Sequence, residues 1–259
     1  MPKFKDILLV TGGLMAGWWL ANQQKPTPSI DAETLIEEMN SRHNEPFQNY
    51  RQLESLTALY QQLNPVAPLP PMRRWAISPD FGVVIMRHIR TQKPQLVVEA
   101  SAGASTIITA YTLRENGSGR VIAIEHDAHF AQAARERIAE HGLDDIATVI
   151  HAPLKPLTLA DSRWPWYDTD LLADLQDIDM LTVDGPPQWG NPAPMARYPA
   201  LPFFYDRLKD DATILVDDTN RSNENKMVAR WLHEYTVHKI AEPETEKGTI
   251  ILQKGPAGS

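Results

Sequence analysis

Acidic residues end four of the apolar runs in this sequence. They are Glu99, Glu125, Asp184 and the pair Asp217 and Asp218, which close the runs 96–98, 121–124, 180–183 and 213–216. In an open α/β sheet, ligands bind beyond the carboxyl ends of the strands. One solvated acid at a strand end is common, but acids at the ends of four predicted strands favour a ligand site at that edge of the predicted sheet.

These acids suit different ligands. An acid that ends the second strand suits a ribose, because one carboxylate can accept hydrogen bonds from both hydroxyls, and that role falls to Glu125. The carboxylates of Asp184, Asp217 and Asp218 converge at adjacent strand ends and suit Mg²⁺ or Ca²⁺, which prefer oxygen ligands. The alternative is that Asp217 and Asp218 hydrogen-bond the loop or cap the next helix.

A turn of small residues follows the first apolar run. Residues 101–105 read SAGAS, and a segment with helical spacing begins at Ile107. Small residues let a ligand approach the backbone, and the free N–H groups at the start of a helix point at it. The turn has no Gly-Lys-Ser/Thr and only one glycine, so it fits neither a phosphate-binding loop nor the dinucleotide fingerprint. It predicts another kind of cradle, although any strand–turn–helix unit can use small residues.

Alternating strands and helices must position these residues. From residue 95 onward apolar runs alternate with helical patterns, which predicts successive βα units with right-handed crossovers. Residues 237–240 and 249–252 flank a charged turn and are predicted to pair antiparallel. The expected fold class is α/β, a Rossmann-like, doubly wound, mostly parallel seven-stranded sheet with an antiparallel last strand, plus an N-terminal helical extension. A short helix is expected at 171–175.

The N-terminal part has a different composition. Residues 1–24 form a hydrophobic segment, and its apolar part, residues 7–21, is shorter than the roughly 20 residues that span a bilayer upright. It is predicted to be a retained membrane anchor, either a minimal membrane (transmembrane) helix or an interfacial segment, with packing on its own domain as the alternative. Residues 25–74 are predicted to be a linker and helical extension, and residues 75–259 the main domain. Two amphipathic helices are expected in the extension, at 32–39 and 47–63.

Composition excludes several classes of protein. The formal net charge is -8 and the pI is about 5.5, so general nucleic-acid binding is not expected, because it needs clustered Lys and Arg. With no cysteine, disulfides, thiolate metal sites and cysteine nucleophiles are excluded. The expected partner is a small-molecule substrate, and a homo-oligomer is left open.

The ordered motifs resemble one known family. VVEASAGAST, AIEHD, IHAPL, DMLTVDGPP, RYPALPFF and ILVDDTNR follow the order and approximate spacing of a bacterial class I S-adenosylmethionine (SAM)-dependent methyltransferase domain family, related to the catechol-type O-methyltransferases. The similarity extends from about Tyr50 to Leu252. It implies an enzyme that uses SAM to methylate an oxygen of a small-molecule or saccharide-like acceptor. Because SAM is made in the cytoplasm, the domain is expected there, attached through residues 7–21 to the inner face of the membrane.

The resemblance also implies roles for individual residues. Cofactor binding is implied for Glu99, Ser101, Gly103, Ser105, Thr106, Glu125, His126, Ala152 and Pro153. An optional Mg²⁺ is implied at Asp184, Asp217 and Asp218, with Asp184 as the catalytic residue. Two positions depart from the catechol enzymes: Asp218 stands where they have Asn, and Pro187 where they have the lysine that acts as base. A non-catalytic, membrane-tethered scaffold that retains the fold is therefore the alternative function.

Two long loops carry aromatic residues and one arginine. Trp164, Trp166, Tyr167 and Trp189 could form a flat wall of a substrate site, with Arg197 pairing an anionic group of the substrate. Packing over the sheet explains the same residues equally well.

Overall fold

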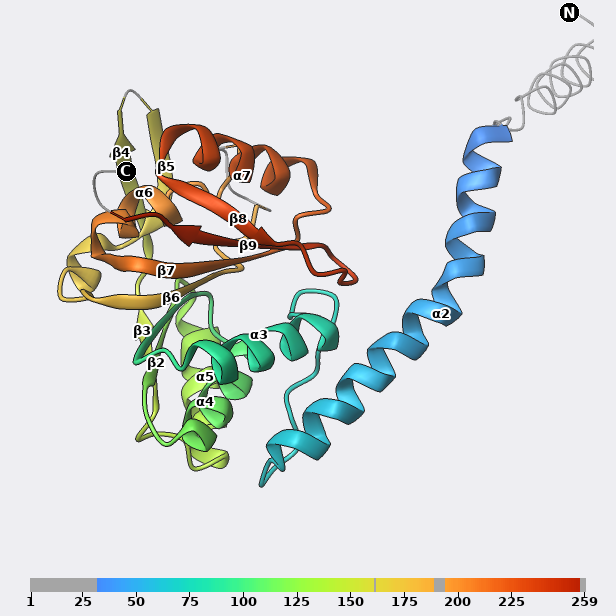
Figure 1. The fold of residues 1–259 in the computed structure, drawn as a ribbon, viewed down its shortest axis with the longest axis horizontal. Helices are drawn as coiled ribbons and strands as arrows, with labels where there is room; N and C mark the ends of the chain where they lie inside the picture. The colour runs from blue at the N-terminus through green and yellow to red at the C-terminus, as the bar shows by residue number, and fades with distance from the viewer. Residues whose placement is uncertain (1–31, 161, 189–193, 257–259) are drawn as a thin grey trace, which may run out of the picture. The chain divides into compact units, whose positions relative to one another are not determined.

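The computed structural model describes the backbone of residues 32–160, 162–188 and 194–256, and side chains from residue 45 onward (Figure 1). The chain forms two compact units, residues 1–47 and residues 48–259. Helix α2 (Ala32–Leu63) begins in the first unit and ends in the second. The two helices expected here are therefore one, and the helix continues through Pro46, which removes one backbone hydrogen-bond donor without ending it.

A seven-stranded sheet forms the centre of the second unit. Its order is β3-β2-β1-β6-β7-β9-β8, in which β9 is antiparallel to both β7 and β8 and the other pairs are parallel. The predicted fold class is confirmed. The strands are β1 (Leu96–Ala100), β2 (Arg120–Glu125), β3 (Ala147–His151), β6 (Ile178–Val183), β7 (Leu208–Asp217), β8 (Val237–Ala241) and β9 (Thr249–Lys254).

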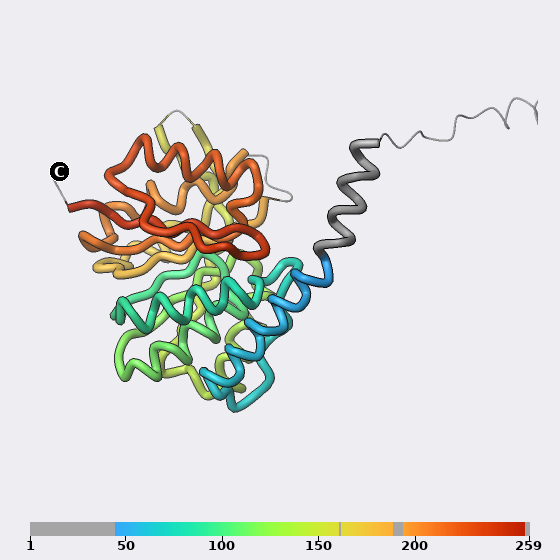
Figure 2. Tube along the Cα trace, turned by 45° about the vertical axis from the view of Figure 1, so that its right-hand side comes forward, coloured from blue at the N-terminus to red at the C-terminus, as the bar shows by residue number. Residues whose placement is uncertain are grey.

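Helices cover both faces of the sheet. Helices α3 (Pro79–Gln92), α4 (Ala104–Asn116) and α5 (Ala128–Glu140) lie on one face, and α6 (Ala200–Phe204) and α7 (Ser222–Glu234) on the other (Figure 1). Figure 2 shows the same layers from a second direction, with the green helices below the sheet and the red helix above it. Successive residues of β1 alternate between the two cores: Val97 packs with α3 and α4, and Val98 with α6 and α7.

The second half of α2 belongs to the α/β unit. Leu59 and Leu63 are buried with the residues of α3 and α4, and the Gln52 Nε2 atom donates a 2.7 Å hydrogen bond to the Asp80 carboxylate. The sequence placed the start of the main domain at residue 75, whereas the compact unit begins at Gln48. The difference arises because the apolar stripe of this helix covers the domain core.

A β-hairpin stands where only a short helix was expected. Strands β4 (Leu154–Leu159) and β5 (Ser162–Tyr167) pair antiparallel, followed by the 3-10 helix η1 (Thr169–Leu172). Trp164 and Trp166 are buried in the core, so packing over the sheet, one of the two explanations offered for them, is the correct one. Trp189 lies outside the described residues.

The predicted membrane anchor, residues 7–21, also lies outside the described residues. Within the part of the chain that the structure describes, no helix combines the length and apolarity needed to cross a bilayer.

Candidate functional site

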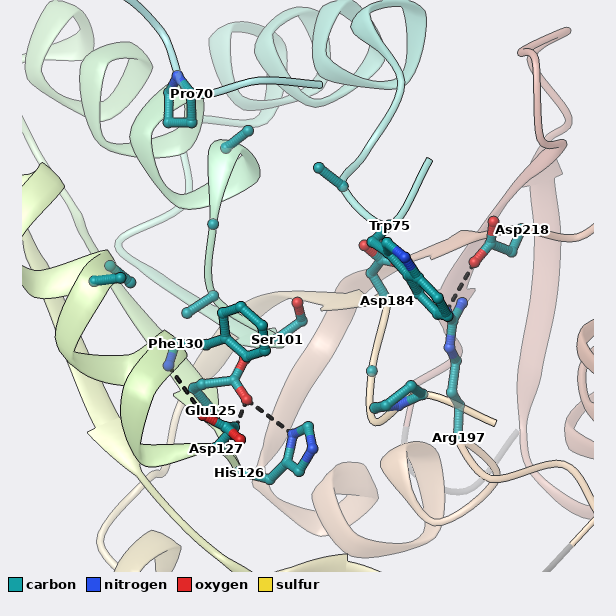
Figure 3. A pocket seen from close by; sticks show the side chains of 18 of the residues that line it. Pro70, Trp75, Ser101, Glu125, His126, Asp127, Phe130, Asp184, Arg197 and Asp218 are labelled. Carbon is teal, nitrogen blue, oxygen red and sulfur yellow. Dashed lines mark hydrogen bonds and ion pairs between the residues drawn. The ribbon is translucent and has the colours of Figure 1, made fainter. Parts of the chain in front are cut away.

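A cavity of about 900 Å³ opens at the carboxyl ends of β1, β2 and β6 (Figure 3). It is lined by residues 101–104 after β1, 125–127 at the end of β2 and 184, 185, 187 and 188 after β6. Strand β1 lies between β2 and β6 in the sheet, so the connections diverge to opposite sides at this point. Such a switch point is where open α/β sheets bind ligands.

The loop after β1 leaves space above its backbone. A Cβ atom added to Gly103 would meet nothing within 4 Å, and the Gly103 N–H donates to the Thr106 hydroxyl at 3.1 Å. Ser101 has a φ of 127°, a conformation that L residues rarely adopt, and its N–H donates to the Ile124 carbonyl. Such backbone outliers cluster at ligand sites. The predicted residues Ser101 and Gly103 therefore form a cradle on the cavity wall.

Glu99, at the end of β1, is hydrogen-bonded to the residues that follow this loop. Its buried carboxylate accepts hydrogen bonds from the hydroxyls of Ser105, Thr106 and Thr109 at 3.3, 2.8 and 2.7 Å. Burial raises the pKa of Glu99 to about 7, although these hydroxyl donors oppose the shift. Three residues predicted to bind the cofactor do not line the cavity: Glu99, Ser105 and Thr106. Their hydrogen bonds connect the end of β1 to the first turns of α4.

Glu125 and His126 line the cavity at the end of β2. Oε1 of Glu125 accepts the Asp127 N–H at 2.9 Å and lies 2.8 Å from Nδ1 of His126, and this hydrogen bond is the largest cause that raises the pKa of His126. Among the described residues, no hydrogen bond reaches Oε2 of Glu125. The carboxylate therefore has an oxygen available to a ligand, as the ribose prediction requires.

Other residues near the end of β2 differ from the prediction. Ala152 is fully buried and donates its N–H to the Glu125 carbonyl, and neither Ala152 nor Pro153 lines the cavity. Phe130, which sequence reasoning missed, lines it with 60% of its surface exposed. Asp127 caps α5 by accepting the N–H groups of His129 and Phe130. The sequence signal that could have identified Phe130 is its place, as an aromatic residue in the first turn of the helix that follows a strand-end acid.

The three predicted metal ligands converge. Carboxylate oxygens of Asp184, Asp217 and Asp218 all lie within 4.8 Å of one another. Asp184 and Asp218 line the cavity, whereas Asp217 is fully buried and neither of its oxygens has a hydrogen-bond partner within the described part of the chain. Burial, then the charges of Asp184 and Asp218, raise the pKa of Asp217 well above its usual range, which favours its neutral form. Burial is also the main cause that raises the pKa of Asp184 to about 6.

Arg197 lies among these acids, which the sequence did not predict. Its Nη2 atom is 2.8 Å from Oδ2 of Asp218 and 3.2 Å from Oδ1 of Asp184, as Figure 3 shows for Asp218. Its Nη1 atom donates to the backbone carbonyl of Asp217 at 3.3 Å. Arg197 lines the cavity and its guanidinium pairs with the chain's own acids, so its pairing with an anionic substrate stays a prediction. Arg197 thus takes one oxygen of Asp184 and one of Asp218, whereas Oδ1 of Asp218 and both oxygens of Asp217 have no hydrogen-bond partner among the described residues.

Trp75 forms the outer wall beside these acids (Figure 3). The indole is 82% exposed and lines the cavity together with Pro70, Pro71 and Pro187. The preceding Arg73 has a left-handed backbone, and its Nε atom lies 3.0 Å from each carboxylate oxygen of Glu246. The segment that carries Trp75 is therefore anchored while the indole itself remains available.

Comparisons with known proteins agree with this geometry. Residues 100–219, slightly less than half of the chain, match the family model of a methyltransferase domain. The O-methyltransferase TomG from Streptomyces achromogenes, solved with SAM, has a TM-score of 0.54 and 15% identity, with 79% of this chain and 89% of that chain covered. An O-methyltransferase from Bacillus cereus, solved with S-adenosylhomocysteine (SAH), has a TM-score of 0.53 and 19% identity, covering 78% and 90%. A Podospora anserina methyltransferase, also solved with SAH, has a TM-score of 0.56 and 14% identity, covering 78% and 88%.

No curated protein matches the chain. The α/β unit has the class I methyltransferase fold, and the resemblance predicted from the sequence motifs is confirmed.

Proposed function

We propose that this protein is a SAM-dependent methyltransferase that methylates a hydroxyl oxygen of a small-molecule acceptor. The observation that carries the proposal is that one cavity joins a small-residue cradle and a ribose-type acid, Gly103 and Glu125, to an acidic and aromatic wall, Asp184 and Trp75. The first pair suits an adenosyl cofactor and the second a ring that bears a hydroxyl. The match of residues 100–219 to the methyltransferase family model supports the same reaction.

The cofactor end of the cavity fits SAM by its chemistry. The cradle at Ser101 and Gly103 is open to a ligand, and Glu125 offers a carboxylate oxygen to the ribose hydroxyls. His126 and Phe130 supply ring surfaces for the adenine. When bound, SAM supplies an electrophilic methyl group for transfer to the acceptor.

The acceptor end aligns the hydroxyl and takes its proton. Asp184 accepts a hydrogen bond from the acceptor hydroxyl and receives the proton as the oxygen gains the methyl group. The indole of Trp75 packs against the flat side of the acceptor ring, whether aromatic or saccharide-like. Alignment of this kind can supply several kcal/mol of the barrier reduction, so little covalent help from the protein is required.

The proposed reaction contains no step through Mg²⁺. A bound divalent ion would lower the pKa of a coordinated acceptor hydroxyl and orient it. One oxygen of Asp184 and one of Asp218 already pair with Arg197, however, so an ion held by all three carboxylates would compete with the guanidinium, whereas the acceptor hydroxyl needs only the second oxygen of Asp184.

Turnover separates this function from the scaffold alternative. Purified full-length protein should bind SAM in calorimetry, and it should form SAH when incubated with SAM and a small-molecule fraction of cell extract. Mass spectrometry would then identify the methylated acceptor by its added methyl group. SAM binding with no SAH formed above a heat-treated control would favour the scaffold, and absence of SAM binding would contradict both.

A further inference from the structure

We propose that Arg197 is the resident cation of the acidic cluster, so that its guanidinium does the electrostatic work of a divalent ion and the site functions without one. The cluster comprises Asp184, Asp217, Asp218 and Glu224. The proposal rests on the proposed function only for its catalytic consequence, because the occupancy of the cluster by Arg197 is a property of the protein alone.

Arg197 is enclosed by acids. Its guanidinium contacts Asp218 at 2.8 Å, Asp184 at 3.2 Å and, on its Nε side, Glu224 at 4.0 Å. All four side chains are at most 11% exposed. Two carboxylates that would coordinate a divalent ion are thus engaged by one planar cation, which holds several oxygens through a fixed fork of N–H donors.

The backbone around Arg197 holds it in this position. Ala196, Tyr198 and Ala200 are buried, and the Tyr198 N–H donates to the Met195 carbonyl at 2.8 Å. The indole N–H of Trp231, on α7, donates to the Tyr198 carbonyl at 3.0 Å. A buried segment on both sides of Arg197 therefore leaves the guanidinium little freedom to withdraw from the acids, as a metal ion entering the cluster would require.

The charges of the cluster favour a guanidinium over an added divalent ion. Arg221 lies 2.8 Å and Lys247 3.9 Å from the Asp218 carboxylate. With Asp217 in its neutral form, the positive charges of Arg197, Arg221 and Lys247 balance the three remaining acids, Asp184, Asp218 and Glu224. An added divalent ion would leave an excess of one positive charge in a largely buried site even if Asp217 then lost its proton, which is unfavourable.

Cation binding to the full-length protein tests the proposal directly. After treatment with chelator, the wild-type protein should show no stoichiometric Mn²⁺ site by electron paramagnetic resonance titration, and no stabilisation by Mg²⁺ in thermal unfolding. Arg197→Met removes the charge while keeping an unbranched side chain, and it should strengthen Mn²⁺ binding by roughly tenfold or more, because unpaired carboxylates then converge. Asp217→Asn in that background should remove the gain.

Arg221→Met is the matched control. Arg221 contacts the same oxygen of Asp218 at the same 2.8 Å as Arg197, but its side chain is 52% exposed. Its loss should strengthen Mn²⁺ binding far less than Arg197→Met does, since Arg197 remains among the acids and the exposed charge of Arg221 is screened by solvent. An equal gain in both variants would show that any nearby positive charge excludes the ion, and would overturn a specific role for Arg197.

The wild-type protein decides the question even if Arg197→Met does not fold. One Mn²⁺ bound with micromolar affinity and lost in Asp217→Asn would overturn the proposal, as would methyl transfer that chelator abolishes and Mg²⁺ restores. The cation titration contains no SAM, so a failure of the proposed methyltransferase activity would leave its result interpretable.

Discussion

Replacing Glu125 with glutamine should weaken SAM binding while leaving the fold intact. Oε1 of Glu125 accepts the Asp127 N–H at 2.9 Å, and a glutamine carbonyl oxygen can accept the same bond. The charge, however, is lost from the bonds proposed to the two ribose hydroxyls. Hydrogen bonds to a charged group contribute about 1.5–3 kcal/mol, so a loss of about 2–3 kcal/mol is expected. This corresponds to a rise in Kd of roughly 30- to 150-fold.

Calorimetry on the wild type, Glu125→Gln and a control variant measures this change. Glu140→Gln is the control, because it makes the same substitution at an exposed position on α5. NMR titration supplies an internal check: the hydrogen bond to Glu125 is the largest cause that raises the pKa of His126, so that pKa should fall in Glu125→Gln. A lowered His126 pKa with unchanged SAM affinity would remove Glu125 from the cofactor site and refute the ribose argument.

Three further predictions concern stability and placement. A Cβ at Gly185 would lie 2.6 Å from the Tyr167 hydroxyl, so Gly185→Ala should lower the free energy of unfolding by about 1–3 kcal/mol in urea titrations, whereas Gly103→Ala, which meets nothing within 4 Å, should not. The pKa of Glu99 is raised from 4.5 to about 7 in the folded state, so the stability that the protonated group contributes is present below pH 4.5 and lost as pH rises to about 7. Glu99→Gln should flatten unfolding free energy against pH across that window, and an unchanged slope would contradict the assignment. Residues 7–21 should place the full-length protein in the membrane fraction with its α/β unit inside the cell; digestion of that unit by protease added to intact cells would refute this placement.

The sheet could be predicted because its strands carry the signal locally. β1, β2 and β6 are short, almost wholly buried runs rich in Val and Ile, separated by helical patterns, and this alternation predicts a parallel sheet. The hairpin was missed for an equally local reason. Pro156 and Pro165 stand opposite each other in β4 and β5. Proline normally argues against a strand, because it has no N–H group to donate a hydrogen bond to the neighbouring strand. Packing of Trp164 and Trp166 in the core outweighs that penalty.

The cofactor end was predicted better than the acceptor end because its residues follow one another closely in sequence. Ser101 and Gly103 follow β1, Glu125 ends β2 and His126 follows it, and topology alone places those two strand ends side by side. Trp75 comes from a segment before the first strand, which no periodic pattern connects to the cavity. Its place depends on long-range contacts such as that between Arg73 and Glu246, which are invisible in a linear sequence.

The acidic cluster shows how far a residue pattern can determine chemistry. Asp184, Asp217 and Asp218 predict that positive charge must be nearby, since three carboxylates cannot remain buried together unneutralised. The pattern cannot tell which cation or proton supplies the neutralisation, because an arginine distant in sequence leaves the spacing of the acids unchanged. In the folded protein Arg197 reaches two of these acids, and Asp217 is favoured in its neutral form by burial and by its neighbours, which raise its pKa. Each of the three acids thus has a means of neutralisation within the chain. Three acids with the spacing of metal ligands therefore indicate that a positive charge or a proton must neutralise them, and an arginine can supply that charge as well as a metal ion can.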